Sequence, residues 1–421
     1  MIIQKKMEKI IFIKKKNIYE DYNQNKLDYL KNEKFNKIFI VKLIFYIFVF
    51  FIFFMIYKSK KEISPLKEIK KFINDCKRFI RYNNKENNNC QNPFLSICLS
   101  AFNMENYIER NILSIINQSF QDFEIILVND NSNDNTGSII KRMQLEDERI
   151  KIINHSKNLG VYKSRIEAIL NAKGTYIIIM DPDDMFLNKN LFYKLYNYNL
   201  EFNLDIIEFS VYRQIEGEKT MFFPNNHFEN HYHNFDKQII YQPDLSNLLY
   251  YLPETGDYSH TICRNIWNKM IKKKIFLDLH KYIGNDYFNE YVITSDDMLM
   301  NIVAYQFAQN YSNINFPGYL YIIREISMSH GDGGITLMKI RTINYLLYFQ
   351  MFYKYIKDFN KDRNYLFYEM KNLNHFIINI KEYNMTEYIP KQIKFFKEII
   401  KDKSTSYGFR KYVENLLLLF Q

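Results

Sequence analysis

Cysteine is scarce in this chain, with four residues among 421: Cys76, Cys90, Cys98 and Cys263. No two of them have the spacing of a zinc finger or zinc ribbon, which argues against a cysteine-ligated metal site. Cys98 falls within an apolar segment, where we expect it to be a small core residue. Cys76 and Cys90 could form a disulfide in an oxidising compartment, but spacing alone does not establish the bond, so the redox compartment is left open.

Glycine is scarce as well, with 11 residues. A nucleotidyltransferase is expected to carry a Gly-rich loop with Lys or Arg after its first strand, and the segment SAFNMENY at that place has no such loop. The sequence also has no internal repeat, RNA-recognition signature or zinc finger. The net charge of +10 comes from lysines that are spread along the whole chain. The charge therefore does not indicate a nucleic-acid partner, because it is not gathered on one segment.

One long hydrophobic run is present at residues 38–57, IFIVKLIFYIFVFFIFFMIY, and its one charge is Lys42. Twenty helical residues span about 30 Å, the thickness of the bilayer core, and a lysine near the end can extend to the interface. We expect a single-pass transmembrane anchor between a polar tail (1–37) and a charged stem (58–92). Lysines on both sides leave the orientation open. The expected location is the membrane of the Golgi or endoplasmic reticulum.

After the stem, short apolar segments alternate with amphipathic ones. This alternation predicts an α/β domain with a mostly parallel sheet flanked by helices, followed by a helical C-terminal region. The expected strands are 94–102, 123–130, 149–155, 175–180 and 204–212, and the expected helices are 106–119, 136–148, 160–174, 265–276 and 295–308, with more helix in 336–421.

Acidic residues follow two of these strands. Asp130 closes the second strand, and the fourth leads into Asp181, Asp183 and Asp184. The carboxyl ends of parallel strands share one edge of a sheet, so these residues should lie at the same edge. Clustered carboxylates repel each other unless a cation is present, and Mg²⁺ or Mn²⁺ binds one or two carboxylates together with ligand phosphates. The turn 181–184 therefore predicts a metal site that holds a diphosphate, although a solvated turn in which Asp184 caps a helix is the alternative.

These segments, taken in order, resemble glycosyltransferase family 2, whose nucleotide-binding domain has the Rossmann-like GT-A fold. The resemblance covers roughly residues 94–330 and supports a GT-A domain at 93–335. The stretches that carry it are SAFN (100–103), QSF (118–120), EIILVNDNSNDNT (124–136), NLGVYKSR (158–165), DPDD (181–184), IWNKMIKKKIF (266–276), SDDMLM (295–300) and YLYIIREISMSH (319–330).

The resemblance implies an inverting hexosyl- or N-acetylhexosaminyltransferase. Its donor would be a nucleotide sugar, a UDP-sugar on family frequency, and its acceptor a hydroxyl of a glycan, glycolipid or glycoprotein. The implied partners are this donor, this acceptor and the membrane, without nucleic acid. The implied site residues are Ala101, Asn103, Asp130, Arg165, Asp181 and Arg324 for the nucleotide sugar, Asp183 with Asp181 and Asp184 for Mn²⁺ or Mg²⁺, and Asp297 as general base with Asp296 beside it.

Three positions depart from the family pattern. Ser100 replaces the usual Pro, Ile166 replaces a frequent Asn, and Asp296 replaces Glu. None of these changes removes a catalytic group, so we expect an active enzyme. A catalytically inactive sugar- or nucleotide-binding scaffold and a nucleotidyltransferase are the alternatives, and Asp296 with Asp297 could instead be a helix N-cap pair.

Overall fold

The computed structural model describes the part of the chain that carries the expected α/β domain. The expected tail, the anchor at 38–57 and the stem up to residue 91 lie outside the described residues, so these expectations stay predictions. Among the described helices, none combines the length and the apolar character needed to cross a bilayer. The described residues are 92–222, 239–247, 265–288, 291–324, 334–361, 378–380, 385, 389–403, 405 and 407–418, all within the compact unit Arg81–Gln421.

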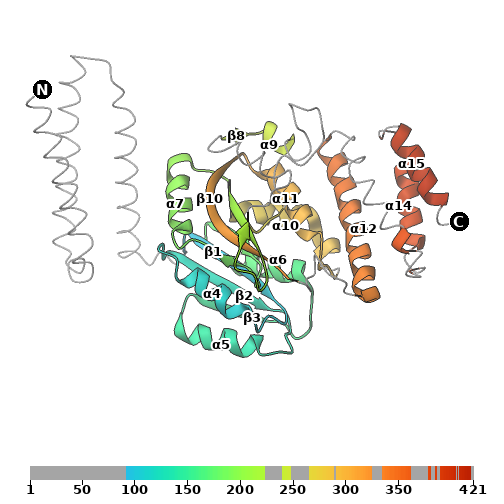
Figure 1. The fold of residues 1–421 in the computed structure, drawn as a ribbon. Helices are drawn as coiled ribbons and strands as arrows, with labels where there is room; N and C mark the ends of the chain where they lie inside the picture. The colour runs from blue at the N-terminus through green and yellow to red at the C-terminus, as the bar shows by residue number, and fades with distance from the viewer. Residues whose placement is uncertain are drawn as a thin grey trace, which may run out of the picture. The chain divides into compact units, whose positions relative to one another are not determined.

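A mixed ten-stranded sheet forms the centre of this unit (Figure 1). Its strand order is β3-β2-β1-β4-β9-β6-β10-β5, with β7 paired to β6 and β8 to β10. β1, β2, β3 and β4 are mutually parallel, whereas β9 runs antiparallel to both β4 and β6. The strands are β1 (Leu95–Ala101), β2 (Phe123–Asn129), β3 (Ile150–Asn154), β4 (Tyr176–Met180), β5 (Met185–Phe186), β6 (Ile206–Ile215), β7 (Met221–Phe222), β8 (Ile240–Tyr241), β9 (Lys269–Lys272) and β10 (Asn310–Ile323).

Helices cover both faces of the sheet. In β1, Ile97 and Leu99 enter one apolar core while Cys98 between them enters the other, because successive strand residues point to opposite faces. The first core is closed by α4, α5 and α7, and the second by α6, α10, α11 and α12. The helices are α4 (Ile108–Ile116), α5 (Thr136–Glu146), α6 (Val161–Asn171), α7 (Leu191–Phe202), α9 (Asp244–Asn247), α10 (Lys273–Phe288), α11 (Asp296–Phe307), α12 (Gly334–Asp358), α14 (Ile389–Lys401) and α15 (Tyr407–Leu418).

The C-terminal helices share this second core. Phe349 and Phe352 of α12, Phe396 of α14 and Phe409 of α15 are fully buried in the cluster that also holds α6 and α11. The expected helix-rich character of residues 336–421 is confirmed where the structure describes them. Since one apolar cluster crosses the expected boundary near residue 336, α12 is packed directly against the sheet-flanking helices.

The strands and helices expected between 94 and 212 are confirmed, with their ends shifted by at most three residues. The helix expected at 265–276 is wrong in its first part. Lys269–Lys272 forms β9 between β4 and β6, and helix begins only at Lys273. The apolar run of β9, with buried Met270 and Ile271, is too short for periodicity to distinguish a strand from a helix. Pairing with the flanking strands β4 and β6 makes it a strand.

Candidate active site

The acidic residues gather at one edge of the sheet, as the sequence predicts. β1 pairs in parallel with β2 on one side and with β4 on the other. Asp130 directly follows β2, and Asp181 directly follows β4. Both residues therefore leave the sheet at the carboxyl edge, where open α/β sheets bind their ligands.

Asp130 is 2% exposed and is fully engaged by protein groups. One of its carboxylate oxygens accepts a hydrogen bond from the Leu159 N–H at 2.8 Å, and the other accepts from the Gly160 N–H at 2.9 Å. His155 lies 2.7 Å from Asp130 and bridges to Glu167 at 2.8 Å. Asp130 thus fixes the turn that opens α6, and its expected contact with a nucleotide base stays a prediction. The sequence reasoning did not select His155, although its place directly after β3 is the available signal.

The segment that follows β1 is locked to the segment that follows β2. The Ala101 carbonyl accepts a hydrogen bond from the Asp130 N–H at 2.8 Å. Asn103 is exposed and has a φ of 55°, and its side-chain oxygen accepts from the Asn133 N–H at 2.9 Å. The Asn103 N–H donates in turn to Ser132 Oγ at 3.1 Å. These bonds present the backbone at Ala101 and the exposed Asn103 beside the acidic edge, where the family resemblance implies nucleotide contacts.

Asp184 anchors the acidic turn to β10. Its side chain is buried, and its two oxygens accept hydrogen bonds from the Tyr319 hydroxyl and the Ile322 N–H, both at 2.8 Å. From α4, the Asn111 side-chain amide donates to the carbonyls of Asp181 and Asp184 at 2.9 Å each. Burial, followed by the neighbouring carboxylates of the turn, raises the pKa of Asp184 well above its usual value. The turn therefore has a fixed backbone, and Asn111 is a positioning residue that sequence reasoning missed.

Two arginines neutralise the remaining carboxylates of the turn. Arg324, directly after β10, pairs with Asp183 at 2.5 Å, and Arg165 of α6 pairs with Asp181 at 2.5 Å. The side chains of Asp181 and Asp183 are 24% and 17% exposed. Burial and the charge of Asp181 raise the pKa of Asp183, and Arg324 opposes this shift. The repulsion that the sequence predicts is thus relieved in part by the protein's own cations.

The same turn provides donors that suit a divalent metal. Among the described residues, no three His, Cys, Asp or Glu side chains converge as a ready cage. Mg²⁺ and Mn²⁺ need only one or two carboxylates when phosphates and water complete the shell. Asp181 and Asp183 are partly exposed hard-oxygen donors from one turn, whereas both oxygens of Asp184 are already occupied. The donor chemistry therefore fits such an ion through Asp181 and Asp183.

Arg165 links this turn to α11. Its guanidinium donates to Asp181 at 2.5 Å and to Asp296 at 2.7 Å, and its side chain is 8% exposed. Burial alone would lower the pKa of Arg165, but the carboxylates of Asp296 and Asp181 outweigh burial and raise the pKa. The guanidinium of Arg165 thereby holds the acidic turn after β4 and the start of α11 together. The guanidinium is occupied by carboxylates, and its expected proximity to the nucleotide stays a prediction.

Asp297 occupies the second position of α11, next to Asp296, and is partly exposed. Burial and then the charge of Asp296 raise the pKa of Asp297 to about 7, against the lowering effect of Arg165. One of its oxygens accepts a hydrogen bond from the Met298 N–H at 2.9 Å. A carboxylate that titrates near neutral pH has the proton affinity that a general base requires.

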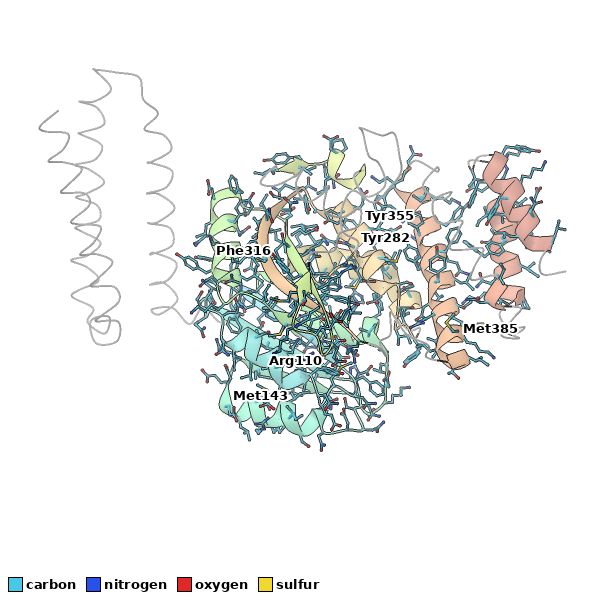
Figure 2. All side chains as sticks on the ribbon, viewed as in Figure 1. Arg110, Met143, Tyr282, Phe316, Tyr355 and Met385 are labelled. Carbon is cyan, nitrogen blue, oxygen red and sulfur yellow. The ribbon has the colours of Figure 1, made fainter. Side chains whose placement is uncertain are left out.

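A further cation, Arg110, lies beside Asp183. Arg110 projects from α4 (Figure 2), and its guanidinium donates to the Asp183 carbonyl at 3.0 Å. The guanidinium groups of Arg110 and Arg324 lie over the Tyr107 ring in cation–π contacts, 4.9 and 4.8 Å from the ring centroid. Within the described part of the chain, the buried Nε atoms of both arginines have no hydrogen-bond partner. The two guanidinium groups place positive charge beside the acidic turn, and the sequence reasoning selected neither Arg110 nor Tyr107.

The segment before β9 packs against the strand β10, which anchors the acidic turn 181–184. Trp267 stacks on Tyr319 and Tyr321, with ring centroids 4.6 and 5.5 Å apart. Trp267 lies in the turn that leads into β9 and not in the helix expected at 265–276. Lys269 and Glu208 are both buried and form an ion pair at 3.2 Å. This segment of the family resemblance is therefore part of the core under the site.

Comparison with known proteins agrees with this architecture. Residues 96–267 match the family model described as glycosyl transferase family 2. An uncharacterized glycosyltransferase, EpsJ of Bacillus subtilis, is 27% identical over 229 residues, which are 54% of this chain and 61% of EpsJ. The glycosyltransferase GlyA of Streptococcus pneumoniae is 26% identical over 238 residues, 56% of this chain and 31% of GlyA. The chain thus spans less than two thirds of these two relatives.

Two further similarities concern a named activity and a solved structure. A Campylobacter jejuni protein named GalNAc(5)-diNAcBac-PP-undecaprenol beta-1,3-glucosyltransferase is 36% identical over 97 residues, 23% of this chain and 31% of that protein. The crystal structure of S. aureus TarS 1–349 in complex with UDP-GlcNAc aligns with a TM-score of 0.48 at 18% identity, covering 77% of this chain and 87% of that one. Residues 96–267 of this chain therefore resemble glycosyltransferase family 2.

Proposed function

We propose that the chain is a metal-dependent, inverting GT-A glycosyltransferase that moves a sugar from a nucleotide sugar to a hydroxyl. The observation that carries this proposal is the bridge made by Arg165, which holds the donor-side Asp181 and the acceptor-side Asp296 on one guanidinium. Asp297 follows Asp296 directly. A base on α11 and a diphosphate-binding turn after β4 would therefore share a single reaction centre.

The donor side is suited to a diphosphate. A Mg²⁺ or Mn²⁺ ion held by Asp183 and Asp181 would supply Lewis-acid stabilisation of the leaving group. Arg110 and Arg324 bring two positive charges to the same turn, which favours the binding of phosphate oxygens there. Negative charge grows on the diphosphate as the bond to the sugar breaks. Cations already fixed beside that charge stabilise the transition state.

On the acceptor side, Asp297 would remove the proton from the attacking hydroxyl. Its pKa of about 7 keeps a large fraction ionised at neutral pH while leaving the carboxylate basic enough to take a proton. Such a base typically contributes about 10²–10⁴-fold in rate. The hydroxyl attacks the anomeric carbon from the face opposite the diphosphate, so the C–O bond to the acceptor forms as the bond to phosphate breaks. One displacement inverts the anomeric centre.

The substrate classes follow from the relatives and the sequence. The TarS structures were solved with UDP and UDP-GlcNAc, and a Campylobacter relative is named for transfer to an undecaprenol-linked glycan. We propose a UDP-sugar as donor and a glycan, glycolipid or glycoprotein as acceptor. The anchor expected at 38–57, in the membrane of the Golgi or endoplasmic reticulum, would place the domain beside lipid-linked acceptors.

Asp297→Asn tests the proposal directly. The full chain is first assayed with a panel of nucleotide sugars, with and without Mn²⁺, for donor hydrolysis and for transfer. The variant should keep donor binding, because the donor-side groups are untouched, and should lose transfer by about 10²–10⁴-fold. Asp278→Asn is the matched control, since Asp278 pairs with Lys274 on the surface, where its side chain is 38% exposed.

Two results would contradict the proposal. Unchanged transfer by Asp297→Asn would remove the general-base assignment. Donor binding by the native chain without hydrolysis or transfer, even with Mn²⁺, would instead identify a catalytically silent scaffold.

A further inference from the structure

The long helix α12 contacts the backbone next to the proposed base through Asn344. This side chain is completely buried. Its oxygen accepts hydrogen bonds from the Ile293 N–H at 2.9 Å and the Thr294 N–H at 3.2 Å, and its amide donates to the Tyr291 carbonyl at 2.9 Å. One side chain from the C-terminal region thus binds three backbone groups of the segment 291–294.

The same segment is held from its other side by α6. The Tyr162 N–H donates to the Val292 carbonyl at 3.2 Å. Gly160 has a φ of 90°, and a Cβ at that position would lie 2.7 Å from the Val292 oxygen. The two backbones approach so closely that only glycine fits. The segment 291–294 is therefore bonded both to the first turn of α6, through Tyr162, and to the middle of α12, through Asn344.

The position of this segment determines where α11 begins. Ser295, which follows it, has a left-handed φ of 64°, and Asp296 and Asp297 are the first two residues of α11. Two residues, Ser295 and Asp296, separate Thr294 from Asp297, and Asp296 already belongs to α11. A displacement of the segment would therefore be passed to the carboxylate of Asp297.

We propose that Asn344 is a positioning residue for Asp297, and that α12 is thereby part of the catalytic architecture. This inference rests on the proposed function of Asp297. Asparagine suits the task because its amide combines one acceptor with two lone pairs and one donor group. A buried asparagine inside a helix is unfavourable by intrinsic propensity, so its three tertiary hydrogen bonds explain its presence.

Asn344→Leu would remove all three hydrogen bonds while keeping the number and branching of the side-chain heavy atoms. Because small misplacements of a reacting group reduce rates steeply, we expect kcat for transfer to fall by about 10²-fold. The donor Kd should change by less than about threefold, since an interaction needed only in the transition state does not contribute to ground-state binding. Hydrogen exchange of the Ile293 and Thr294 amides should become faster, which reports on the clamp without any activity assay.

Two variants separate positioning from loss of stability. Thr342→Val removes the hydrogen bond from the buried Thr342 hydroxyl to the Met338 carbonyl at 2.9 Å, which lies within α12 and does not reach the segment 291–294. It should retain native kcat. Asn344→Asp keeps both accepting interactions, and its second carboxyl oxygen can donate to the Tyr291 carbonyl when protonated, so it should recover at least about tenfold of the kcat lost in Asn344→Leu.

The outcomes are distinguishable from those that test the function. If the native chain transfers sugar and Asn344→Leu retains its kcat while the two amides exchange faster, the positioning role is wrong and the function stands. Equal losses of kcat in Thr342→Val and Asn344→Leu would also overturn it, because general loosening of α12 would then explain both. A native chain without transfer activity removes the proposed function, and with it this inference.

Discussion

Replacing Arg165 with Met tests the central ionic bridge of the site. The variant keeps a long side chain of similar shape but removes the charge that lies 2.7 Å from Asp296 and 2.5 Å from Asp181. Met is therefore a better choice than Ala, which would also leave a cavity. Both carboxylates would remain without their cation, and they would be held next to each other at the start of α11 and the end of β4.

The expected loss of stability follows from the burial of each pair. The side chains of Arg165 and Asp296 are 8% and 3% exposed, and removing one partner of a pair this buried costs about 3–5 kcal/mol. Asp181 is 24% exposed, so water compensates part of its charge, and its pair adds only about 1 kcal/mol. We expect Arg165→Met to lower the free energy of unfolding by about 4–6 kcal/mol, a large share of the typical 5–15 kcal/mol.

Urea denaturation of the native chain, Arg165→Met, Asp296→Asn and the double variant measures this loss as a double-mutant cycle. The double variant should be more stable than Arg165→Met alone, because it no longer buries an uncompensated carboxylate, and the coupling energy should reach about 2–3 kcal/mol. A loss below about 1 kcal/mol, as for an exposed ion pair, or additive single effects would refute the reasoning.

Three further predictions concern acidity, donor binding and backbone geometry. Because the pKa of Asp297 is raised to about 7 and its ionised form is the base, kcat should rise with pH through about 7, and Asp297→Asn should abolish that limb of the pH–rate profile. Arg324→Met should weaken donor binding about tenfold, through the loss of a charged donor to phosphate, as measured by calorimetry. Gly160→Ala should lower the stability by at least about 2 kcal/mol in thermal unfolding, from strain and a backbone clash. Gly217→Ala, at a φ of 84° with open space around it, should lose less.

The region from β1 to β6 could be predicted from the sequence because its signals are local. Apolar residues repeat with the helix period in α4 and form short continuous runs in the strands, so the type of each element is encoded within about ten residues. Ile108, Ile112 and Ile115 are all buried on one face of α4, as their spacing predicts. The parallel alternation then places Asp130 and Asp181 at one edge without any knowledge of distant contacts.

The partners of the acidic residues could not be predicted in this way. Asp183 is paired with a residue that lies after β10, and Asp184 is bonded to β10 itself. The short β9 is a strand because β4 and β6 flank it, whereas its own sequence is compatible with helix. Asn344 carries no sequence signal that links it to the segment 291–294, some fifty positions earlier.

The sequence by itself determined the order of the elements, the acidic sheet edge and the resemblance of residues 96–267 to a known family, since each depends on local patterns and motif order. Only the tertiary structure decided which cation neutralises each carboxylate, that Arg165 pairs with Asp296 across 131 sequence positions, and that α12 holds the start of α11. Periodicity describes which face of an element is buried. It does not specify which distant residue meets that face, because that choice depends on the packing of the whole domain.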